Sequence, residues 1–269
     1  FWTPQSQYAG YILAEQDGLY RDCGLDLKVL HYDGTPSVKM LSDGKADFVS
    51  LTLLDALEAR NNGLKLVNVF QLLAGSSFVV VSRKGPISTL EDLKGKEIVT
   101  YRAFNPTLKK EITRRLDGDV SIIEVYSCVE VFLCGAYDYL ICTSYNELFE
   151  IEESGFDITR GNVLRLGDTG LDIAEDGVYA LESFIKANPD AVDKFAEASA
   201  LGWKAAEADI EHSLDVTLDR MEINHIVRNR YHERKMLKEM IRLEGEGSDF
   251  RLSREQYEKA ASLVGEDRT

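Results

Sequence analysis

Trp2, Gln5 and Tyr8 are the first side chains in the sequence that could contact a small molecule. They follow what reads as the end of a buried strand, closed by Phe1 and Trp2 and stopped by Pro4, which has no N–H to donate. In an open α/β sheet, ligands bind outside the carboxyl ends of the strands, beside helix N-termini. The three side chains are therefore expected at a ligand site. The alternative for Trp2 is an ordinary packed aromatic of the core.

The same reasoning selects polar and aromatic side chains that follow later strands. They are Thr52 and Ser76 in the first part of the chain, and Tyr101, Tyr145, Asn146 and Glu147 in the second. A ring that stacks on Trp2 or on a tyrosine gains about 0.5–1.5 kcal/mol beyond the burial of its area. Glu147 can accept charge-assisted hydrogen bonds from an exocyclic amine. The alternatives are a first-turn glutamate favoured by the helix dipole, and loop residues such as Gln5 and Ser76 that only satisfy backbone groups.

Alternating strands and helices must position these side chains. Ser6 can cap a helix that runs to about Asp17, and Gly18 suits the left-handed position at its end. Strands are expected over 25–29, 46–49 and 66–72, with helices after Pro36 and over 53–61. This run of βα units predicts a mostly parallel sheet with helices on both faces.

A second set of βα units begins after a composition break at Arg83–Pro86. Strands are expected over 78–82, 98–101, 120–125 and 139–142, and helices over 106–115, 128–133 and 145–153. Residues 176–181 read as a return crossing, and four helices follow: one from Asn188, then 210–221, 223–241 and 254–264.

Two crossings between two α/β lobes describe a bilobal periplasmic-binding-protein fold (type II) with a helical C-terminal part. We expect the first lobe over 1–80 plus 180–269 and the second over 81–179. A ligand held between such lobes favours the closed state of the hinge.

Composition and charge argue against some classes of function. The net charge of -15 argues against a nucleic-acid partner, because phosphate binding needs a basic surface. No stretch approaches the roughly 20 apolar residues that span a bilayer. No signal peptide is visible and the chain does not begin with Met, so we expect a sequence processed or trimmed at its start.

The four cysteines, Cys23, Cys128, Cys134 and Cys142, are expected to be buried free thiols, with one disulfide as the alternative.

A set of short motifs resembles one known family. They are Trp-x-Pro-x-x-x-Tyr-Ala-Gly-Tyr (2–11), Gly-Leu-Tyr-x-x-x-Gly-Leu-Asp-Leu (18–27), Gly-Lys-Ala-Asp-Phe (44–48), Asp-Leu-Lys-Gly-Lys (92–96), Tyr-Asn-Glu (145–147), Glu-Asp-Gly-Val-Tyr (175–179), Asn-Pro-Asp-Ala-Val-Asp-Lys-Phe (188–195), Gly-Trp-Lys (202–204) and His-Glu-Arg-Lys-Met-Leu (232–237). Their order and spacing resemble the thiamine-pyrimidine precursor-binding proteins, a family of ABC-transporter periplasmic substrate-binding proteins.

The resemblance implies a solute-binding protein outside the cytoplasmic membrane, monomeric, with a small heteroaromatic ligand and an ABC permease as partner. A lipoprotein cysteine in the native upstream flank would attach it to the membrane and support transport. The alternative partner is a signalling protein, since similar domains serve as sensor modules; a membrane span downstream would support that role.

The same family has eukaryotic relatives that are pyrimidine synthases, with a pyridoxal-phosphate lysine, a nearby histidine and a cysteine-rich loop. The corresponding segments here are Val49–Asp55, without lysine or histidine, and Gly170–Ala174, without cysteine. A Schiff base needs an amine, so we predict no enzyme and no cofactor. Asp172, in the second segment, is a further candidate ligand contact.

The four histidines show no metal-ligand spacing, so no metal is expected. Arg102 keeps a sulfonate or nitrate ligand open as an alternative.

Overall fold

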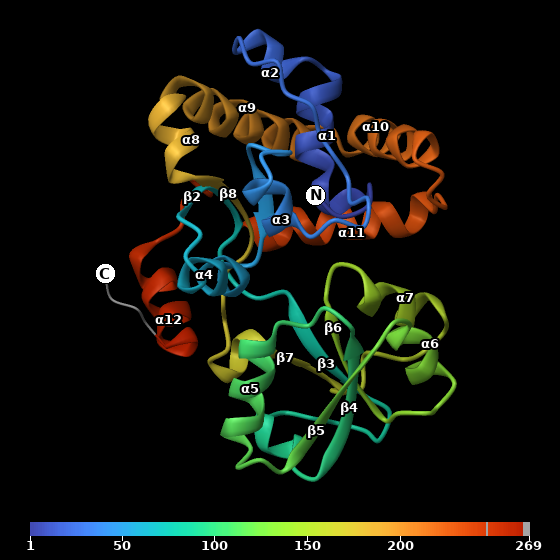
Figure 1. Cartoon of the computed structure of the whole chain (residues 1–269). Coiled ribbons are helices and arrows are strands. Elements are labelled where there is room, and N and C mark those ends of the chain that lie inside the picture. Colours follow the sequence, from blue (N-terminus) through green and yellow to red (C-terminus); the bar gives the residue numbers. More distant parts are fainter. Residues whose placement is uncertain (246, 266–269) are drawn as a thin grey trace. The chain divides into compact units, whose positions relative to one another are not determined.

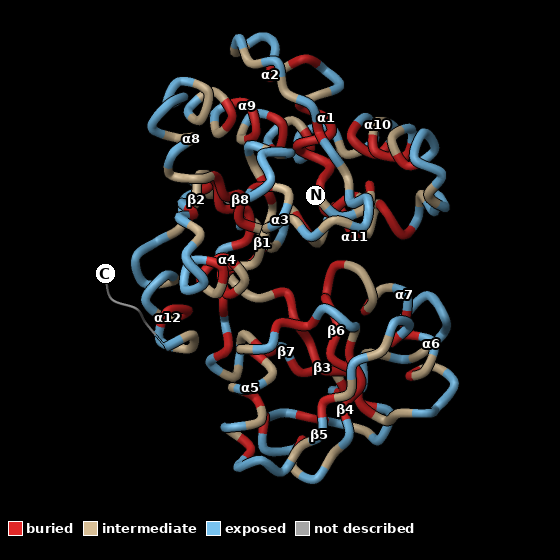
Figure 2. The backbone as a smooth tube through the Cα atoms, in the orientation of Figure 1, coloured by how far each residue is buried: buried red, intermediate tan, exposed pale blue. Residues whose placement is uncertain are grey.

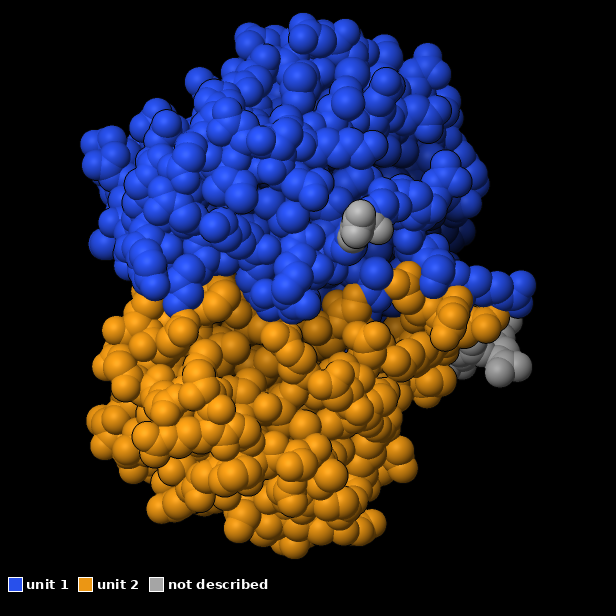
Figure 3. Space-filling view, turned by 180° about the vertical axis from the view of Figure 1, so that it is seen from behind, with its two compact units in different colours: residues 1–74, 174–254 blue, residues 75–173, 255–269 orange. Residues whose placement is uncertain are grey.

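The chain folds into two compact units in the computed structural model, which describes residues 1–245 and 247–265 (Figure 3). Unit 1 comprises 1–74 and 174–254, and unit 2 comprises 75–173 and 255–269. The chain therefore passes between the units near 74, 173 and 254, where the sequence placed boundaries at 80 and 179 only and assigned all of 180–269 to the first lobe. The second boundary differs because the segment expected as the return crossing forms the strand Glu175–Leu181, which pairs entirely within unit 1.

Unit 1 contains a three-stranded sheet in the order β1 (Val49–Leu51), β8 (Glu175–Leu181) and β2 (Leu66–Leu73). β8 lies in the middle and is antiparallel to both neighbours. The expectation of a mostly parallel sheet is wrong for this unit, because the returning strand inserts between the two strands that sequence order would pair.

Two strands expected at the start of the chain are not formed. Residues 1–2 and 25–32 are not assigned to any strand. The Phe1 ammonium donates to the Leu30 carbonyl at 3.1 Å, and the Tyr32 N–H donates to the Trp2 carbonyl at 3.4 Å. Val29 donates its N–H to the Glu15 carboxylate at 2.9 Å instead of to a neighbouring strand. Side-chain acceptors and the N-terminus thus take the place of a ladder.

Helices surround the sheet of unit 1 (Figure 1). They are η1 (Ser6–Tyr8), α1 (Ala9–Gln16), α2 (Leu19–Asp22), α3 (Ser37–Ser42), α4 (Leu53–Asn61), α8 (Glu182–Ala187), α9 (Pro189–Ala208), α10 (Ile210–Ile223) and α11 (Arg230–Glu244). Ser6 does not cap its helix; its N–H donates to the buried Glu233 of α11 at 2.7 Å. The helix predicted over 223–241 starts at Arg230 rather than 223, because His225 has a φ of 59° and interrupts it.

A close crossing of α1 and α9 forms the centre of unit 1. A Cβ added to Gly202 would lie 2.2 Å from the Gly10 carbonyl oxygen, and one added to Gly10 would lie 2.5 Å from the Trp203 ring. Trp203 is fully buried and meets Tyr11 edge-on, with ring centroids 5.7 Å apart. The two glycines let the helix backbones approach, and the aromatic rings fill the space beside them. This packing fixes α1, and with it the segment that carries Tyr8.

Unit 2 contains a five-stranded sheet in the order β5-β4-β6-β3-β7. The strands are β3 (Phe78–Ser82), β4 (Lys96–Tyr101), β5 (Val120–Val125), β6 (Tyr139–Thr143) and β7 (Val163–Arg165). β5, β4 and β6 are parallel, and β3 pairs antiparallel with β6 and β7. A parallel arrangement is therefore present on one side of this sheet, from the edge strand β5 through β4 to β6.

The α-helices of unit 2 lie close to their predicted positions in the chain, although the sequence assigned the helix over 254–264 to the first lobe. The helices of this unit are η2 (Leu90–Leu93), α5 (Pro106–Arg115), α6 (Cys128–Leu133), α7 (Glu147–Glu153), η3 (Leu166–Thr169) and α12 (Arg254–Val264). Thr89 and Asp92 form a reciprocal capping box at η2. Asn105 caps α5 from its side-chain oxygen, and Pro106 occupies the first turn. Figure 2 shows the buried residues of unit 2 gathered on its strands, and all five residues of β3 are buried.

All four cysteines are free thiols. Cys128 and Cys142 are buried, as expected, whereas Cys134 is exposed after the last turn of α6. Within the part of the chain that the structure describes, no helix has the length and apolar character needed to cross a bilayer.

Candidate functional site

Tyr8 is the predicted site residue that unit 1 holds most firmly. Its ring is buried and stacks on Phe1, with centroids 4.6 Å apart. Its hydroxyl interacts with the Trp2 backbone and with the Ser50 side chain of β1. Burial, and next to it the nearby Asp176 carboxylate, raises the pKa of Tyr8 well above its usual value. Tyr8 therefore stays neutral and serves as a hydrogen-bonding group.

Asp176 and Gln7 join Tyr8, although neither was selected from the sequence. Gln7 Nε2 donates to both carboxylate oxygens of Asp176, at 3.0 and 2.9 Å. Gln5 Nε2 in turn donates to Gln7 Oε1 at 2.6 Å. We call Gln5, Gln7, Tyr8, Ser50 and Asp176 the Asp176 cluster. It combines a phenol, two amides, a hydroxyl and a carboxylate in one unit.

Burial raises the pKa of Asp176 to about 6, and the hydrogen bond from Gln7 opposes this shift. No lysine or arginine shifts the pKa of Asp176. In the described part of unit 1, no lysine or arginine hydrogen-bonds the side chains of Gln5, Gln7 or Asp176. The cluster is consequently suited to a ligand that is neutral or cationic and donates hydrogen bonds.

Trp2 and Thr52 have different surroundings from those expected. Trp2 is 53% exposed and stacks on Tyr32 with centroids 4.5 Å apart, so the alternative of a packed core aromatic is wrong. Thr52 is the N-cap of α4: its hydroxyl accepts from the Asp55 N–H at 3.1 Å and donates to the Asp55 carboxylate at 2.6 Å. Trp2 offers an open ring face, whereas the Thr52 hydroxyl is committed to its helix.

Ser76 and Asp172 are brought together in unit 2, although the sequence placed Ser76 in the first lobe. The Ser76 N–H donates to Asp172 Oδ1 at 2.8 Å, and the Ser76 hydroxyl accepts from the Phe78 N–H at 3.2 Å. A Cβ on Gly75 would lie 2.4 Å from the same carboxylate oxygen. The pair therefore lies where the chain enters and leaves unit 2.

The remaining predicted residues lie at the carboxyl ends of β4 and β6. Tyr101 closes β4 beside Phe78 and Phe104, with centroid distances of 6.4 and 6.2 Å. Tyr145 is buried after β6, and Asn146 precedes the first residue of α7. That residue, Glu147, accepts from the Thr143 N–H at 3.0 Å and from the Thr143 hydroxyl at 2.5 Å. One oxygen of Glu147 is thus engaged within unit 2.

Replacing Glu147 with alanine is expected to lower the free energy of unfolding of unit 2 by about 1–3 kcal/mol, because it leaves the two Thr143 donors without their acceptor. The measurement is urea unfolding followed by circular dichroism. Glu130→Ala is the matched control, since Glu130 is an exposed acid in the first turn of α6. Equal stability of the Glu147 and Glu130 variants would show that the Thr143 contacts do not stabilise the unit.

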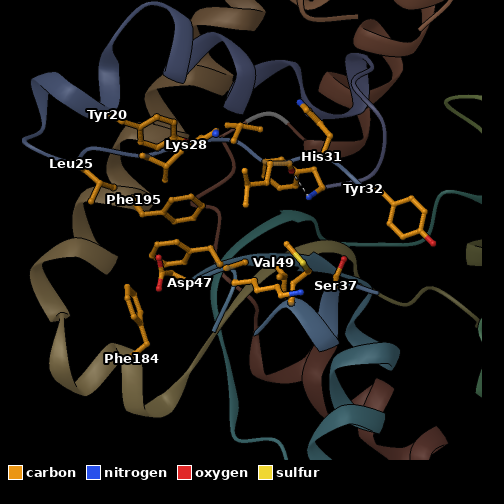
Figure 4. A pocket seen from close by; sticks show the side chains of 18 of the residues that line it. Tyr20, Leu25, Lys28, His31, Tyr32, Ser37, Asp47, Val49, Phe184 and Phe195 are labelled. Carbon is orange, nitrogen blue, oxygen red and sulfur yellow. Dashed lines mark hydrogen bonds between the residues drawn. The ribbon is translucent and has the colours of Figure 1, made fainter. Parts of the chain in front are cut away.

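A cavity of about 330 Å³ in unit 1 borders the predicted site residues, because Phe1, which stacks on Tyr8, and Tyr32, which stacks on Trp2, both line it (Figure 4). It is lined by the segment 25–33, by residues 45–49, and by Phe184 and Phe195, and by no residue of the predicted site. His31 Nδ1 lies 3.1 Å from the Trp2 carbonyl, while its buried Nε2 has no hydrogen-bond partner in the described structure. Burial lowers the pKa of His31 to about 4. The cavity lies along the segment expected to form a strand.

Two other kinds of site were tested against the geometry. In the described ranges, no group of three or more histidine, cysteine or acidic side chains could hold a metal ion. Arg102, the candidate anion ligand, lies over the Tyr126 ring at 4.7 Å and hydrogen-bonds the Tyr126 hydroxyl. The guanidinium is therefore occupied by an exposed tyrosine of its own unit.

Comparisons with known proteins identify the family and the fold of the chain. The family model described as NMT1/THI5 like matches residues 5–212. The riboflavin-binding protein RibY of Chloroflexus aurantiacus is 24% identical over 229 residues, covering 81% of this chain and 64% of RibY. The 4-amino-5-hydroxymethyl-2-methylpyrimidine phosphate synthase THI5 of Saccharomyces cerevisiae is 24% identical over 218 residues, covering 73% of this chain and 62% of THI5. The chain thus spans less than two thirds of these relatives.

Solved structures share the fold at low identity. A Bordetella bronchiseptica protein has a TM-score of 0.68 at 20% identity, covering 97% of this chain and 85% of its own. The periplasmic aliphatic sulphonate binding protein SsuA of Escherichia coli has a TM-score of 0.64 at 18% identity, covering 88% and 76%. The chain therefore belongs to the NMT1/THI5-like family and has the type II periplasmic-binding-protein fold.

Proposed function

We propose that this chain is an extracytoplasmic solute-binding protein for a small heteroaromatic molecule, a thiamine-pyrimidine precursor or a related compound. The Asp176 cluster is the observation that carries the proposal: it offers amide, phenol and carboxylate groups, with the open face of Trp2 in the same unit. The family match and the binding-protein fold support it. So does the relative RibY, a riboflavin-binding protein.

We further propose that the second unit contributes Tyr101, Tyr145, Asn146 and Glu147, with Ser76 and Asp172 near the connections. The chain passes between its units near 74, 173 and 254, so a ligand that binds residues of both would favour the closed state of such a hinge. The proposed protein is a monomer that delivers its ligand to an ABC permease, with a signalling protein as the alternative partner.

A synthase reaction is the competing function, because the relative THI5 is a pyrimidine phosphate synthase. Pyridoxal-phosphate chemistry requires an amine for the Schiff base, and the segment Val49–Asp55 contains neither lysine nor histidine. The segment Gly170–Ala174 contains no cysteine. We therefore infer binding without turnover. A lysine adduct with pyridoxal phosphate, together with pyrimidine product, would overturn this inference.

A thermal-shift screen tests the proposed function. The panel contains hydroxymethylpyrimidine, its formylamino derivative, thiamine, taurine and nitrate. A ligand present at about 100 times its Kd adds about 2.7 kcal/mol to the folded state and raises the Tm. We expect a shift with a pyrimidine and none with taurine or nitrate. A shift with taurine or nitrate alone would contradict a heteroaromatic ligand.

Trp2→Ala is expected to weaken binding of the pyrimidine by about 2-fold to 10-fold, because the ring loses a stacking surface. The stability of the free protein should change little, since Trp2 is 53% exposed. Isothermal titration measures the affinity. Tyr231→Ala is the control, because Tyr231 is an exposed aromatic of α11 in the same unit. Unchanged affinity in the Trp2 variant would exclude stacking on this indole.

A further inference from the structure

Asp176 has a backbone conformation that few side chains adopt. Its φ is 53°, in the left-handed region, where aspartate and asparagine are tolerated far better than most residues. It is the second residue of β8, and its neighbours Glu175 and Gly177 pair with Leu73 and Gln71 of β2. A central strand therefore holds the carboxylate in a fixed position, which is what a recognition group needs.

The carboxylate of Asp176 keeps unused acceptor capacity. A carboxylate offers about four acceptor sites. One amide nitrogen, Gln7 Nε2, approaches both oxygens, and no other hydrogen-bond donor to Asp176 is found in the described residues. The residue is half-buried, so part of it is accessible to a ligand. By contrast, one oxygen of Glu147 already accepts both donors of Thr143.

We propose that Asp176 is the specificity-determining residue of unit 1, and that it binds a heteroaromatic edge on which an amino group lies next to a ring nitrogen. This inference rests on the proposed function. One carboxyl oxygen accepts from the amino group, and the other shares a single proton with the ring nitrogen. Gln7 keeps the carboxyl plane in place by donating to both oxygens. Anionic groups such as sulfonate are repelled by the same carboxylate.

The shared proton gives the proposal a pH signature. Burial raises the pKa of Asp176 to about 6, so below that pH the carboxyl group already carries the proton. Above it, a neutral ligand must bind together with a proton, and its affinity falls as the pH rises. The titratable groups that interact electrostatically with Asp176 are Tyr8 and Tyr11. Burial raises the pKa of both, so both stay neutral over this range.

Two substitutions of Asp176 are compatible with its left-handed backbone conformation. Asp176→Asn keeps a residue that tolerates a left-handed φ, and its amide presents the donor and acceptor of a protonated carboxyl group. Asp176→Gly removes the side chain at a φ that glycine adopts freely. Asp117→Gly is the control: Asp117 also has a left-handed φ, 55°, but lies in an exposed turn of unit 2.

Isothermal titration from pH 5 to pH 8 tests the proposal, with 4-amino-5-hydroxymethyl-2-methylpyrimidine and the same ring without its amino group. The wild type is expected to bind the amino ring about 10-fold to 100-fold more tightly than its analogue. It should also take up a proton above about pH 6, seen as a dependence of the heat on the ionisation enthalpy of the buffer. Asp176→Gly should lose the discrimination, and Asp117→Gly should retain it. Asp176→Asn should bind the amino ring with a flat pH profile.

Three results would overturn the proposal. Asp176→Gly could discriminate the two rings as the wild type does, Asp176→Asn could keep the wild-type pH profile, or the wild type could bind the amino ring without proton uptake. Circular dichroism verifies that each variant is folded, and the asparagine variant decides the matter if the glycine variant unfolds. Binding of neither ring by the wild type would remove the proposed function, and this inference with it.

Discussion

Replacing Trp203 with alanine is expected to lower the free energy of unfolding of unit 1 by about 3–5 kcal/mol. Trp203 is fully buried, so its removal both loses apolar contacts and leaves a cavity. The crossing of α1 and α9 cannot close over that space easily, because Gly202 already lies against the Gly10 carbonyl. A loss of this size is a large share of the 5–15 kcal/mol typical of a folded domain.

Urea unfolding followed by far-UV circular dichroism measures this effect. Leu201→Ala is the control, since Leu201 is the preceding residue of α9 and is 44% exposed. It should change the stability by about 0.5 kcal/mol or less. A Trp203 variant within about 1 kcal/mol of the wild type would mean that the α1–α9 crossing is not the centre of unit 1.

Replacing Glu15 with alanine is expected to cost about 3–5 kcal/mol, because it leaves a partly buried guanidinium unpaired. Glu15 Oε2 binds Arg220 of α10 at 2.6 Å, with 20% and 16% of the two side chains exposed. Its other oxygen accepts from the Val29 N–H, the contact that holds the segment 25–32 to α1. Both partners lose their acceptor in the variant.

The exposed pair Arg228–Glu222 supplies the control for Glu15. Its side chains are 44% and 62% exposed, so Glu222→Ala should cost about 1 kcal/mol at most. Thermal and urea unfolding of both variants give the comparison. Equal losses in the two variants would contradict the role assigned to Glu15, namely that it anchors the segment beside the cavity.

Local signals predicted the elements of this chain best where pattern and turn chemistry agreed. Pro106 marked a helix start that the structure contains. The helix over 53–61 and the strands over 78–82 and 120–125 also have their predicted bounds. Each of these elements is specified by neighbours in the sequence, so no tertiary contact was needed to find it.

Long-range pairing decided the elements that the sequence could not predict. Leu25, Leu27 and Val29 alternate like a strand, yet the Val29 N–H donates to Glu15 and the Phe1 ammonium donates to the Leu30 carbonyl. β8 pairs antiparallel between β1 and β2, which no local pattern indicates. Ser76 was assigned to the first lobe because the boundary was placed six residues beyond the division near 74.

The candidate site was predicted only in part. Gln5 and Tyr8 do belong to one cluster of unit 1, but its acid was missed. Asp176 stands in the motif Glu-Asp-Gly-Val-Tyr, where an aspartate before glycine reads as a turn. Its left-handed φ and its hydrogen bond to Gln7, 169 positions away, exist only in the folded chain. A polar residue interrupting an apolar crossing strand was the one available signal.

Native mass spectrometry of the chain with 4-amino-5-hydroxymethyl-2-methylpyrimidine tests the central claim most directly, because it reports stoichiometry and chemical change together. The account predicts one ligand per chain, released on collisional activation with its mass unchanged, and a protein of unaltered mass. Persistent absence of the one-to-one complex, or a covalent adduct on the chain, would contradict a solute-binding protein that holds its ligand by stacking and hydrogen bonds.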